Sequence, residues 1–382
     1  IQMFVMALSD SPARMAYAGA VLMLLAGCVS APAKPPVARP PVSKPVRTVS
    51  NPVIMPLPET SSRPPAPVIR QGNDEAPAAL EPQIHELWRN FPGRTGIAIL
   101  AIDDGWSLAK RGEELFPQQS VSKLWVAMTV FDQVDRGKLK LDSLVRITRD
   151  DLAVFHQPIR DRVIANGEIQ ESVASLLEQA ITKSDNTAND SLLRTVGGPE
   201  AVRDFIARKG LGKIRFGPGE RQLQAGIAGM SWQQDYAIGN RFTEARAKLS
   251  YDQRKTALDR YLADPVDGAA PMALVRALGM LAKGDLLSAS STRSLLAMME
   301  RTSSGPNRLK AGVPAGWRFG HKTGTGQQLE GVSTGYNDIG IMTAPDGKRY
   351  ALAVMMGDTT ASVPQRMEMM QGVSRAVGFI HR

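Results

Sequence analysis

A proline-rich segment near the start of the chain limits where a folded core can form. Residues 31–70 contain twelve prolines, six Lys or Arg, one Glu and no aromatic residue. A stretch of this composition cannot bury enough apolar surface to fold, and it is typical of an extended, semi-rigid linker. We therefore expect residues 29–80 to form a disordered tether and residues 81–382 to fold. The tether's basic residues could attract anionic headgroups or wall polymers, or could simply be solvated.

A short apolar run precedes this tether and ends at the only cysteine of the chain. Residues 16–27 are too few to span a membrane and end in small residues, as in a secretory signal peptide. Leu25-Ala-Gly-Cys28 resembles a bacterial lipobox, so residues 1–28 are predicted to be a lipoprotein signal peptide with lipidation at Cys28. An ordinary signal peptide is the alternative. Val29 is not the aspartate associated with inner-membrane retention in enteric bacteria, so we expect a periplasmic protein anchored to the outer membrane of a Gram-negative bacterium.

The scarcity of cysteine and histidine excludes several kinds of site. One cysteine cannot form a disulfide framework or a Cys-based zinc or iron–sulfur centre. Four histidines without an HxH or HExxH pair argue against a catalytic metal, and we expect no metal or other cofactor. The formal net charge of +9 indicates anionic surroundings or ligands but does not identify them, and no nucleic-acid partner is predicted.

The folded segment begins and ends with strand patterns and is helical between them. Strands are expected at 95–102, 319–323, 338–343 and 350–355, and helices at 81–91, 120–134 and 364–380. Further helical segments dominate up to about residue 300. This order predicts an α+β fold, an α/β sandwich whose antiparallel sheet is built from both termini and flanked by helices. An all-helical lobe would be inserted in it, with the active site between the two parts.

Two serine–lysine pairs have the S-x-x-K spacing that can join a nucleophile to its base. A serine is a poor nucleophile until a base takes its proton, which a lysine one helical turn away can do. Ser107 and Lys110 lie in a strand-like region, where residues three apart point to opposite faces. Ser120 and Lys123 begin an expected helix, where such residues share a face and the terminus favours developing negative charge. Ser120 is therefore the predicted nucleophile.

Two more motifs follow along the chain. The Ser-Asp-Asn sequence at 184–186 would by itself favour a helix cap, and the Lys-Thr-Gly sequence at 322–324 a strand that ends in a turn. In their order and spacing after S-x-x-K, however, the motifs resemble those of class A serine β-lactamases and penicillin-binding proteins. The resemblance covers nearly all of residues 81–382, which we expect to form one catalytic domain with an enlarged active-site loop at about 217–271.

The resemblance implies a role for each motif residue. Ser120 attacks the β-lactam carbonyl, Lys123 helps to remove its proton, and Ser184 relays a proton to the leaving nitrogen. The backbone N–H groups of Ser120 and Thr325 form the oxyanion hole. The side chains assigned to substrate binding are Asn186, Gln224, Arg308, Lys322, Thr323 and Thr325. Arg308 would meet the substrate carboxylate with its planar guanidinium, and an exposed surface arginine is the alternative.

The resemblance also implies a glutamate that activates the deacylating water. The family places it in an E-x-x-L-N pattern about 36 residues after the serine of Ser-Asp-Asn, and Glu220 has this offset from Ser184. The chain reads Glu-Arg-Gln-Leu-Gln at 220–224, so Gln224 replaces the asparagine that usually holds the water. An ordinary exposed loop glutamate is the alternative.

The loop that carries Glu220 departs from the family pattern. Pro218 stands where an arginine usually pins this loop to an aspartate, and the candidate aspartate, Asp267, follows Glu220 by 47 residues instead of about a dozen. About 34 extra residues therefore lie here, among them an expected helix at 251–262. An insertion this long beside an active site is usually functional. It could cover the pocket, narrow the substrate range or shift the deacylating water.

We therefore expect a monomeric serine hydrolase that opens β-lactam rings through an acyl-enzyme on Ser120, deacylated by a water that Glu220 activates. The first alternative is a D,D-peptidase or esterase-like penicillin-binding protein with slow deacylation, which shares every acylation residue and acts on peptidoglycan peptides. The second is a non-hydrolysing penicillin-binding sensor or wall-binding module, for which we see no sensor domain in the sequence.

Overall fold

The computed structural model describes residues 75–381. The predicted signal peptide, Cys28 and most of the predicted tether lie outside the described residues. Within residues 75–381 no helix is both long and apolar enough to cross a bilayer.

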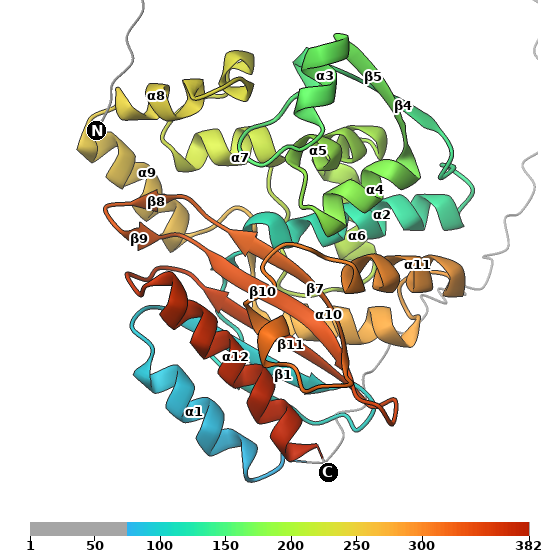
Figure 1. Cartoon of the computed structure of the whole chain (residues 1–382), viewed down its shortest axis with the longest axis vertical. Helices are drawn as coiled ribbons and strands as arrows, with labels where there is room; N and C mark the ends of the chain where they lie inside the picture. The colour runs from blue at the N-terminus through green and yellow to red at the C-terminus, as the bar shows by residue number, and fades with distance from the viewer. Residues whose placement is uncertain (1–74, 382) are drawn as a thin grey trace, which may run out of the picture. The chain divides into compact units, whose positions relative to one another are not determined.

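The described part of the chain is built on an antiparallel sheet of five strands, in the order β2-β1-β11-β10-β7 (Figure 1). The strands are β1 (Thr95–Ala101), β2 (Ser107–Lys110), β7 (Arg318–Thr325), β10 (Tyr336–Thr343) and β11 (Arg349–Met356). β1 pairs with β11, with Ile97 opposite Val354, so the early strand and the last strand meet in the middle of the sheet. The prediction of a sheet built from both termini is confirmed.

Alternation along the central strands directs side chains into two separate cores. Ile97 and Ile99 of β1 pack with the apolar faces of α1 (Leu80–Asn90) and α12 (Val363–Ile380), which lie side by side on one face of the sheet (Figure 1). Ala98 and Leu100 point the other way, into a core that includes α10 (Pro271–Lys283). Because strand side chains alternate between faces, a fully buried run such as β1 requires helices on both sides.

Further helices form a lobe on the second face. They are α2 (Lys123–Asp135), α3 (Arg160–Asn166), α4 (Val173–Thr182), α5 (Asn186–Thr195), α6 (Pro199–Arg208), α7 (Glu220–Ile227), α8 (Arg241–Ala247), α9 (Tyr251–Ala263) and α11 (Ala289–Glu300). Short 3₁₀ helices are η1 (Gln119–Ser122), η2 (Arg149–Asp151), η3 (Gln234–Ala237) and η4 (Leu309–Gly312). Every residue of α2 from Lys123 to Asp132 is buried, so this helix forms the centre of the lobe.

The lobe differs from the sequence prediction in one respect, because it also contains strands. β4 (Leu144–Thr148) and β5 (Glu168–Ser172) form an antiparallel pair, with Ile147 opposite Ile169. These strands are short and only partly buried, so few side chains mark their alternation in the sequence. Two shorter pairs join β3 (Phe116–Pro117) to β6 (Gly268–Ala269) and β8 (Gln328–Leu329) to β9 (Val332–Ser333).

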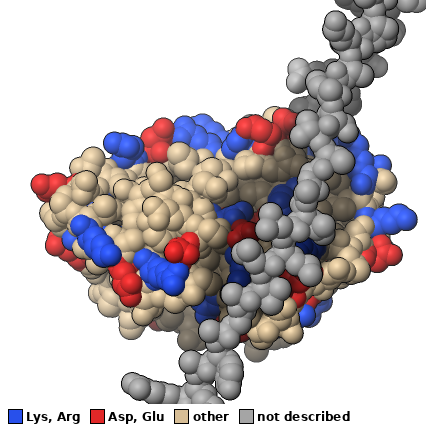
Figure 2. Space-filling view, turned by 90° about the horizontal axis from the view of Figure 1, so that it is seen from above, with Lys and Arg blue, Asp and Glu red and all other residues tan. Residues whose placement is uncertain are grey.

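Charged residues of both signs are interspersed on the face seen in Figure 2. On the visible part of this face, neither sign gathers into a large patch. The net positive charge of the chain therefore does not identify a binding surface there, and the distribution of charge inside the pockets is more informative.

Candidate active site

The predicted nucleophile lies where β3 leads into the buried helix α2. Ser120 belongs to η1, and Lys123 is the first residue of α2, so the two are one turn apart. The Lys123 Nζ lies 2.8 Å from the Ser120 Oγ. The preceding residue, Gln119, has a left-handed backbone (φ 54°), and its N–H donates to the Asp267 carboxylate at 2.8 Å. Such a conformation is uncommon for a residue other than glycine and here turns the chain at the nucleophile.

Glu220 completes a buried chain of polar groups behind Ser120. Its Oε2 lies 3.1 Å from the Lys123 Nζ, although the two residues are 97 positions apart in sequence. The Glu220 and Lys123 side chains are 5% and 0% exposed. The alternative of an exposed loop glutamate is therefore wrong, and Ser120, Lys123 and Glu220 form a continuous path for proton movement.

The first turn of α7 is held by a residue that the sequence analysis missed. Asp190, on α5, accepts hydrogen bonds from the backbone N–H of Glu220 at 3.0 Å and of Arg221 at 3.3 Å. Burial, and then the charge of Glu220, raise the pKa of Asp190. Asp190 follows Asn186 by four residues, so both lie on one face of α5, and this spacing was the available signal.

Gln224 fixes the other oxygen of the glutamate. Its Nε2 donates to Glu220 Oε1 and to Gln119 Oε1, each at 3.0 Å. Its Oε1 accepts from the Gln327 side chain at 2.9 Å. Both ends of the amide are therefore occupied by protein groups. Gln119 and Gln327 were not predicted as site residues, because nothing in a lone glutamine marks it for a network of this kind.

The Ser-Asp-Asn motif both caps a helix and contributes to the site. Asp185 caps α5 by accepting the Ala188 N–H at 2.9 Å, while Ser184 precedes it in a left-handed conformation (φ 59°). The Ser184 Oγ accepts a hydrogen bond from the Lys322 Nζ at 2.8 Å. Burial, and then the nearby cations Lys123 and Arg308, hold the pKa of Lys322 well below its usual range.

Arg308 is buried against the strand that carries Lys322. Its guanidinium donates to the carbonyls of Gly324 and Asn337 at 2.9 and 2.7 Å and to the Thr325 Oγ1 at 2.6 Å. It also lies over the Tyr336 ring, 3.8 Å from the centroid. The residue is only 7% exposed, so the alternative of an exposed surface arginine is wrong. Thr323, on the same strand, shares a hydrogen bond with the Ser304 hydroxyl at 2.8 Å.

The enlarged loop is anchored without the arginine–aspartate pair. Asp267 accepts the Gln119 N–H and, at 2.9 Å, the hydroxyl of Tyr261 from the inserted helix α9. Burial raises the pKa of Asp267 to about 6, against the effect of these hydrogen bonds. The insertion therefore supplies its own partner for the aspartate.

These residues surround one pocket of about 550 Å³. The predicted site residues that line it are Ser120, Ser184, Asn186, Glu220, Gln224, Arg308, Thr323 and Thr325. The other two predicted residues, Lys123 and Lys322, are buried behind it and reach Ser120 and Ser184. All ten predicted residues thus come together, and Phe155 and Arg246 join them in the wall.

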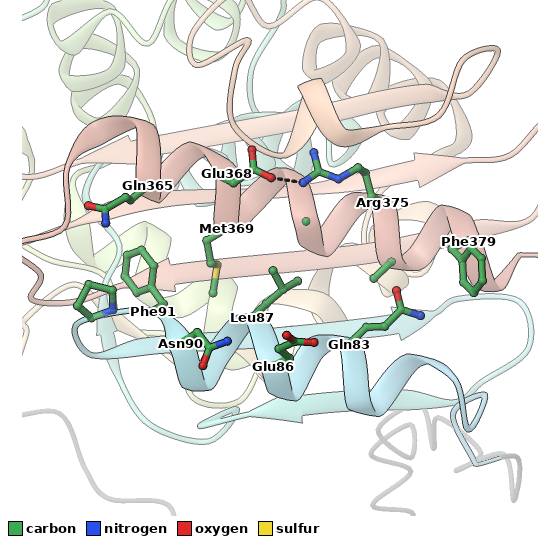
Figure 3. Close-up of a pocket in the computed structure, with 13 residues that line it drawn as sticks. Gln83, Glu86, Leu87, Asn90, Phe91, Gln365, Glu368, Met369, Arg375 and Phe379 are labelled. Carbon is green, nitrogen blue, oxygen red and sulfur yellow. Dashed lines mark hydrogen bonds and ion pairs between the residues drawn. The ribbon is translucent and has the colours of Figure 1, made fainter.

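A second groove, of about 730 Å³, lies between α1 and α12 (Figure 3). Its wall contains the apolar side chains Leu87, Phe91 and Met369, and the ion pair of Glu368 with Arg375 crosses one side. No serine or lysine lines it, so the nucleophile and its base belong to the smaller pocket. Among residues 75–381 no group of three or more His, Cys, Asp or Glu side chains could hold a metal ion.

Comparison with known proteins agrees with this arrangement. A family model described as "Beta-lactamase enzyme family" matches residues 79–379. The extended-spectrum β-lactamase PER-1 of Pseudomonas aeruginosa is 31% identical over 284 residues, covering 74% of this chain and 81% of that protein. The β-lactamase VEB-1 of the same organism is 27% identical, covering 72% and 82%.

Solved structures show the same similarity in three dimensions. The crystal structure of the TLA-3 extended-spectrum β-lactamase matches with a TM-score of 0.65 at 26% identity, covering 80% of this chain and 99% of that one. An ancestral class A β-lactamase matches with a TM-score of 0.61 at 29% identity, covering 78% and 99%.

Proposed function

The chain belongs to the class A β-lactamases, and from this premise we propose how its residues open a β-lactam ring and release the product. The enzyme is a serine β-lactamase. The observation that carries the mechanism is the buried chain from Ser120 through Lys123 to Glu220, with contacts of 2.8 and 3.1 Å.

In acylation, the Ser120 Oγ attacks the lactam carbonyl carbon. As its proton moves to Lys123, the lysine passes a proton to Glu220, so no charge is created in the buried space without a partner. The N–H groups of Ser120 and Thr325 stabilise the oxygen of the tetrahedral intermediate. When the ring C–N bond breaks, Ser184 protonates the nitrogen and is reprotonated by Lys322, 2.8 Å away. The lowered pKa of Lys322 favours this transfer.

Binding of the substrate carboxylate would balance the positive charges that surround Lys322. Burial, and then the charges of Lys123 and Arg308, lower the pKa of Lys322. An anion held by Lys322, Thr323 and Thr325 would relieve this repulsion and gain charge-assisted hydrogen bonds. Arg308 supports the same group through Thr325, and Asn186, which donates to the Val154 carbonyl at 2.7 Å, would meet the substrate's side-chain amide.

Deacylation uses Glu220 as a general base towards water, after Glu220 has released the proton it received during acylation and Lys322 has regained the one it gave to Ser184, both by exchange with solvent. Gln224 orients the carboxylate through one oxygen, while Lys123 holds the other. Because the Gln224 amide is already occupied by Glu220, Gln119 and Gln327, its part is to position Glu220 rather than to hold the water alone. Breakdown of the ester then returns the proton to Ser120.

The test follows the acyl-enzyme directly. Wild type and Glu220→Gln are mixed with a chromogenic cephalosporin, and turnover is compared with the intact mass of the protein. We expect Glu220→Gln to lose roughly a hundredfold or more in turnover and to accumulate an adduct on Ser120, since one general base contributes about 10²- to 10⁴-fold. Wild-type-like turnover by this variant would contradict the assignment. A long-lived adduct on the wild type would instead favour a penicillin-binding protein.

We also propose that the enzyme is exported and lipid-anchored through Cys28, which lies outside the described residues. The support is the apolar run that ends in Leu25-Ala-Gly-Cys28 and the proline-rich segment behind it. Expression of the whole chain with radiolabelled palmitate should label the wild type but not Cys28→Ser. Equal labelling of the two would reject the anchor.

A further inference from the structure

Arg246 is a charged side chain in the wall of the active-site pocket with no ion pair among the described residues. Arg246, on α8 of the inserted loop, lines the pocket together with Ser120 and Glu220. Glu220 is the only carboxylate in that wall, and it is already paired with Lys123. Within residues 75–381 no carboxylate forms an ion pair with Arg246; the charged group that acts on its pKa is another arginine, Arg254.

The hydrogen-bonding capacity of Arg246 is largely unused. Its Nη2 donates to the Gln328 carbonyl at 3.0 Å, whereas its Nε is buried and has no hydrogen-bond partner among the described residues. A guanidinium carries five N–H donors in a planar fork that matches a carboxylate. Burial, and then the like charge of Arg254, lower the pKa of Arg246, so an anion beside it would relieve both effects.

Arg308 provides a comparison inside the same pocket. The Nε of Arg308 is also buried without a hydrogen-bond partner among the described residues, but its two Nη atoms make three hydrogen bonds, to Gly324, Asn337 and Thr325, and hold it as a fixed part of the wall. Arg246 instead lies on α8 and contacts the carbonyl of Gln328 in β8, so different elements hold the two arginines.

The neighbours of Arg246 indicate which part of a substrate it would meet. Phe242 lies four residues earlier, on the same face of α8, and packs edge-on against Phe155 with the ring centroids 5.0 Å apart. Phe155 follows Val154, whose carbonyl accepts from Asn186. α8 therefore lies against the end of the pocket where Asn186 would bind the amide side chain of a β-lactam.

We propose that Arg246 is a specificity-determining residue that binds a carboxylate on the acyl side chain of a β-lactam. The inference rests on the proposed function, because it takes Asn186 to mark the side-chain end of the pocket. The pocket would then have two anion-binding groups. The group around Lys322 receives the carboxylate of the ring system, and Arg246, from the inserted loop, receives the carboxylate of the side chain.

The test compares two penicillins that differ by one carboxylate. Benzylpenicillin and carbenicillin share a phenylacetyl skeleton, and carbenicillin adds a carboxylate on the side chain. The measurement is kcat/KM and KM for both substrates with wild type, Arg246→Gln and Arg246→Lys. The matched control is Arg241→Gln, on the same helix, where the arginine is exposed and paired with Asp235.

We expect Arg246→Gln to lower the carbenicillin-to-benzylpenicillin ratio of kcat/KM roughly tenfold, mostly through KM, as loss of a charge-assisted hydrogen bond would. Arg246→Lys should restore part of the ratio, Arg241→Gln should leave it as in wild type, and added salt should reduce the difference. An unchanged ratio in Arg246→Gln, with benzylpenicillin still hydrolysed, would overturn the inference alone. Failure of the wild type to hydrolyse either penicillin would overturn the proposed function with it.

Discussion

The two S-x-x-K segments give the molecule an internal comparison. In both, the lysine Nζ lies 3.1 Å from a glutamate oxygen: Lys110 pairs with Glu81, and Lys123 pairs with Glu220. The first pair is 17% and 63% exposed, whereas the second is 0% and 5% exposed. The two ion pairs therefore have the same length but differ greatly in their exposure to solvent. An exposed ion pair contributes little to stability because water already solvates both charges. In a buried ion pair the charges have lost this water, and they are stabilised only by each other and by their hydrogen bonds.

The largest expected difference between the segments is in catalysis. Ser120→Ala should lower kcat/KM for a chromogenic cephalosporin by at least about a thousandfold, because it removes the nucleophile itself. Ser107→Ala, at the exposed first residue of β2, should leave kcat/KM within about twofold of wild type. Steady-state hydrolysis by the two purified variants checks both values. A large loss in Ser107→Ala, or full activity in Ser120→Ala, would reverse the assignment of the nucleophile.

The next difference is in stability. Lys123→Gln leaves Glu220 as a buried charge without its partner, and we expect the free energy of unfolding to fall by about 3 to 5 kcal/mol. Lys110→Gln removes an exposed pair and should change it by no more than about 1 kcal/mol. Urea unfolding at pH 7 measures both. Similar losses in the two variants would show that burial does not distinguish these pairs.

The smallest expected difference depends on pH and on Asp267, which holds the residue before Ser120. Burial raises the pKa of Asp267 to about 6, so between about pH 4 and pH 6 the folded chain keeps a proton that the unfolded chain releases. Its contribution to stability is therefore present at low pH and is lost as pH rises through 6. Relative to Asp267→Asn, the wild type should lose up to about 3 kcal/mol between pH 4 and pH 7.

Urea unfolding at both pH values measures this difference, and Asp264→Asn is the matched control. Asp264 is exposed and pairs with Arg215, so its replacement should leave the pH dependence as in wild type. A wild-type pH dependence in Asp267→Asn would show that another group is responsible.

Much of the fold follows from patterns that are local in sequence. The fully buried run of β1 and the late strands β7, β10 and β11 are readable because alternation and turn residues act over a few positions. β4 and β5 escaped prediction because they are short and only partly buried. The site has a similar limit: the spacing from Asn186 could have placed Asp190 on the right face of α5, but its contact with Glu220, and that of Gln119 with Gln224, join residues far apart in the sequence.

By itself, the sequence determined which residues form the three motifs. It also determined that Ser120 and Lys123 lie one turn apart, because this follows from the geometry of a helix. It also determined that residues near both ends of the folded segment would build one sheet. Only the tertiary structure decided that Glu220 meets Lys123 across 97 residues and that Lys322 meets Ser184 across 138. It also decided that Arg246 lines the pocket without a counter-ion. The physical reason is that burial depends on long-range packing, and burial, not the length of the ion pair, separates the reactive Lys123 from Lys110.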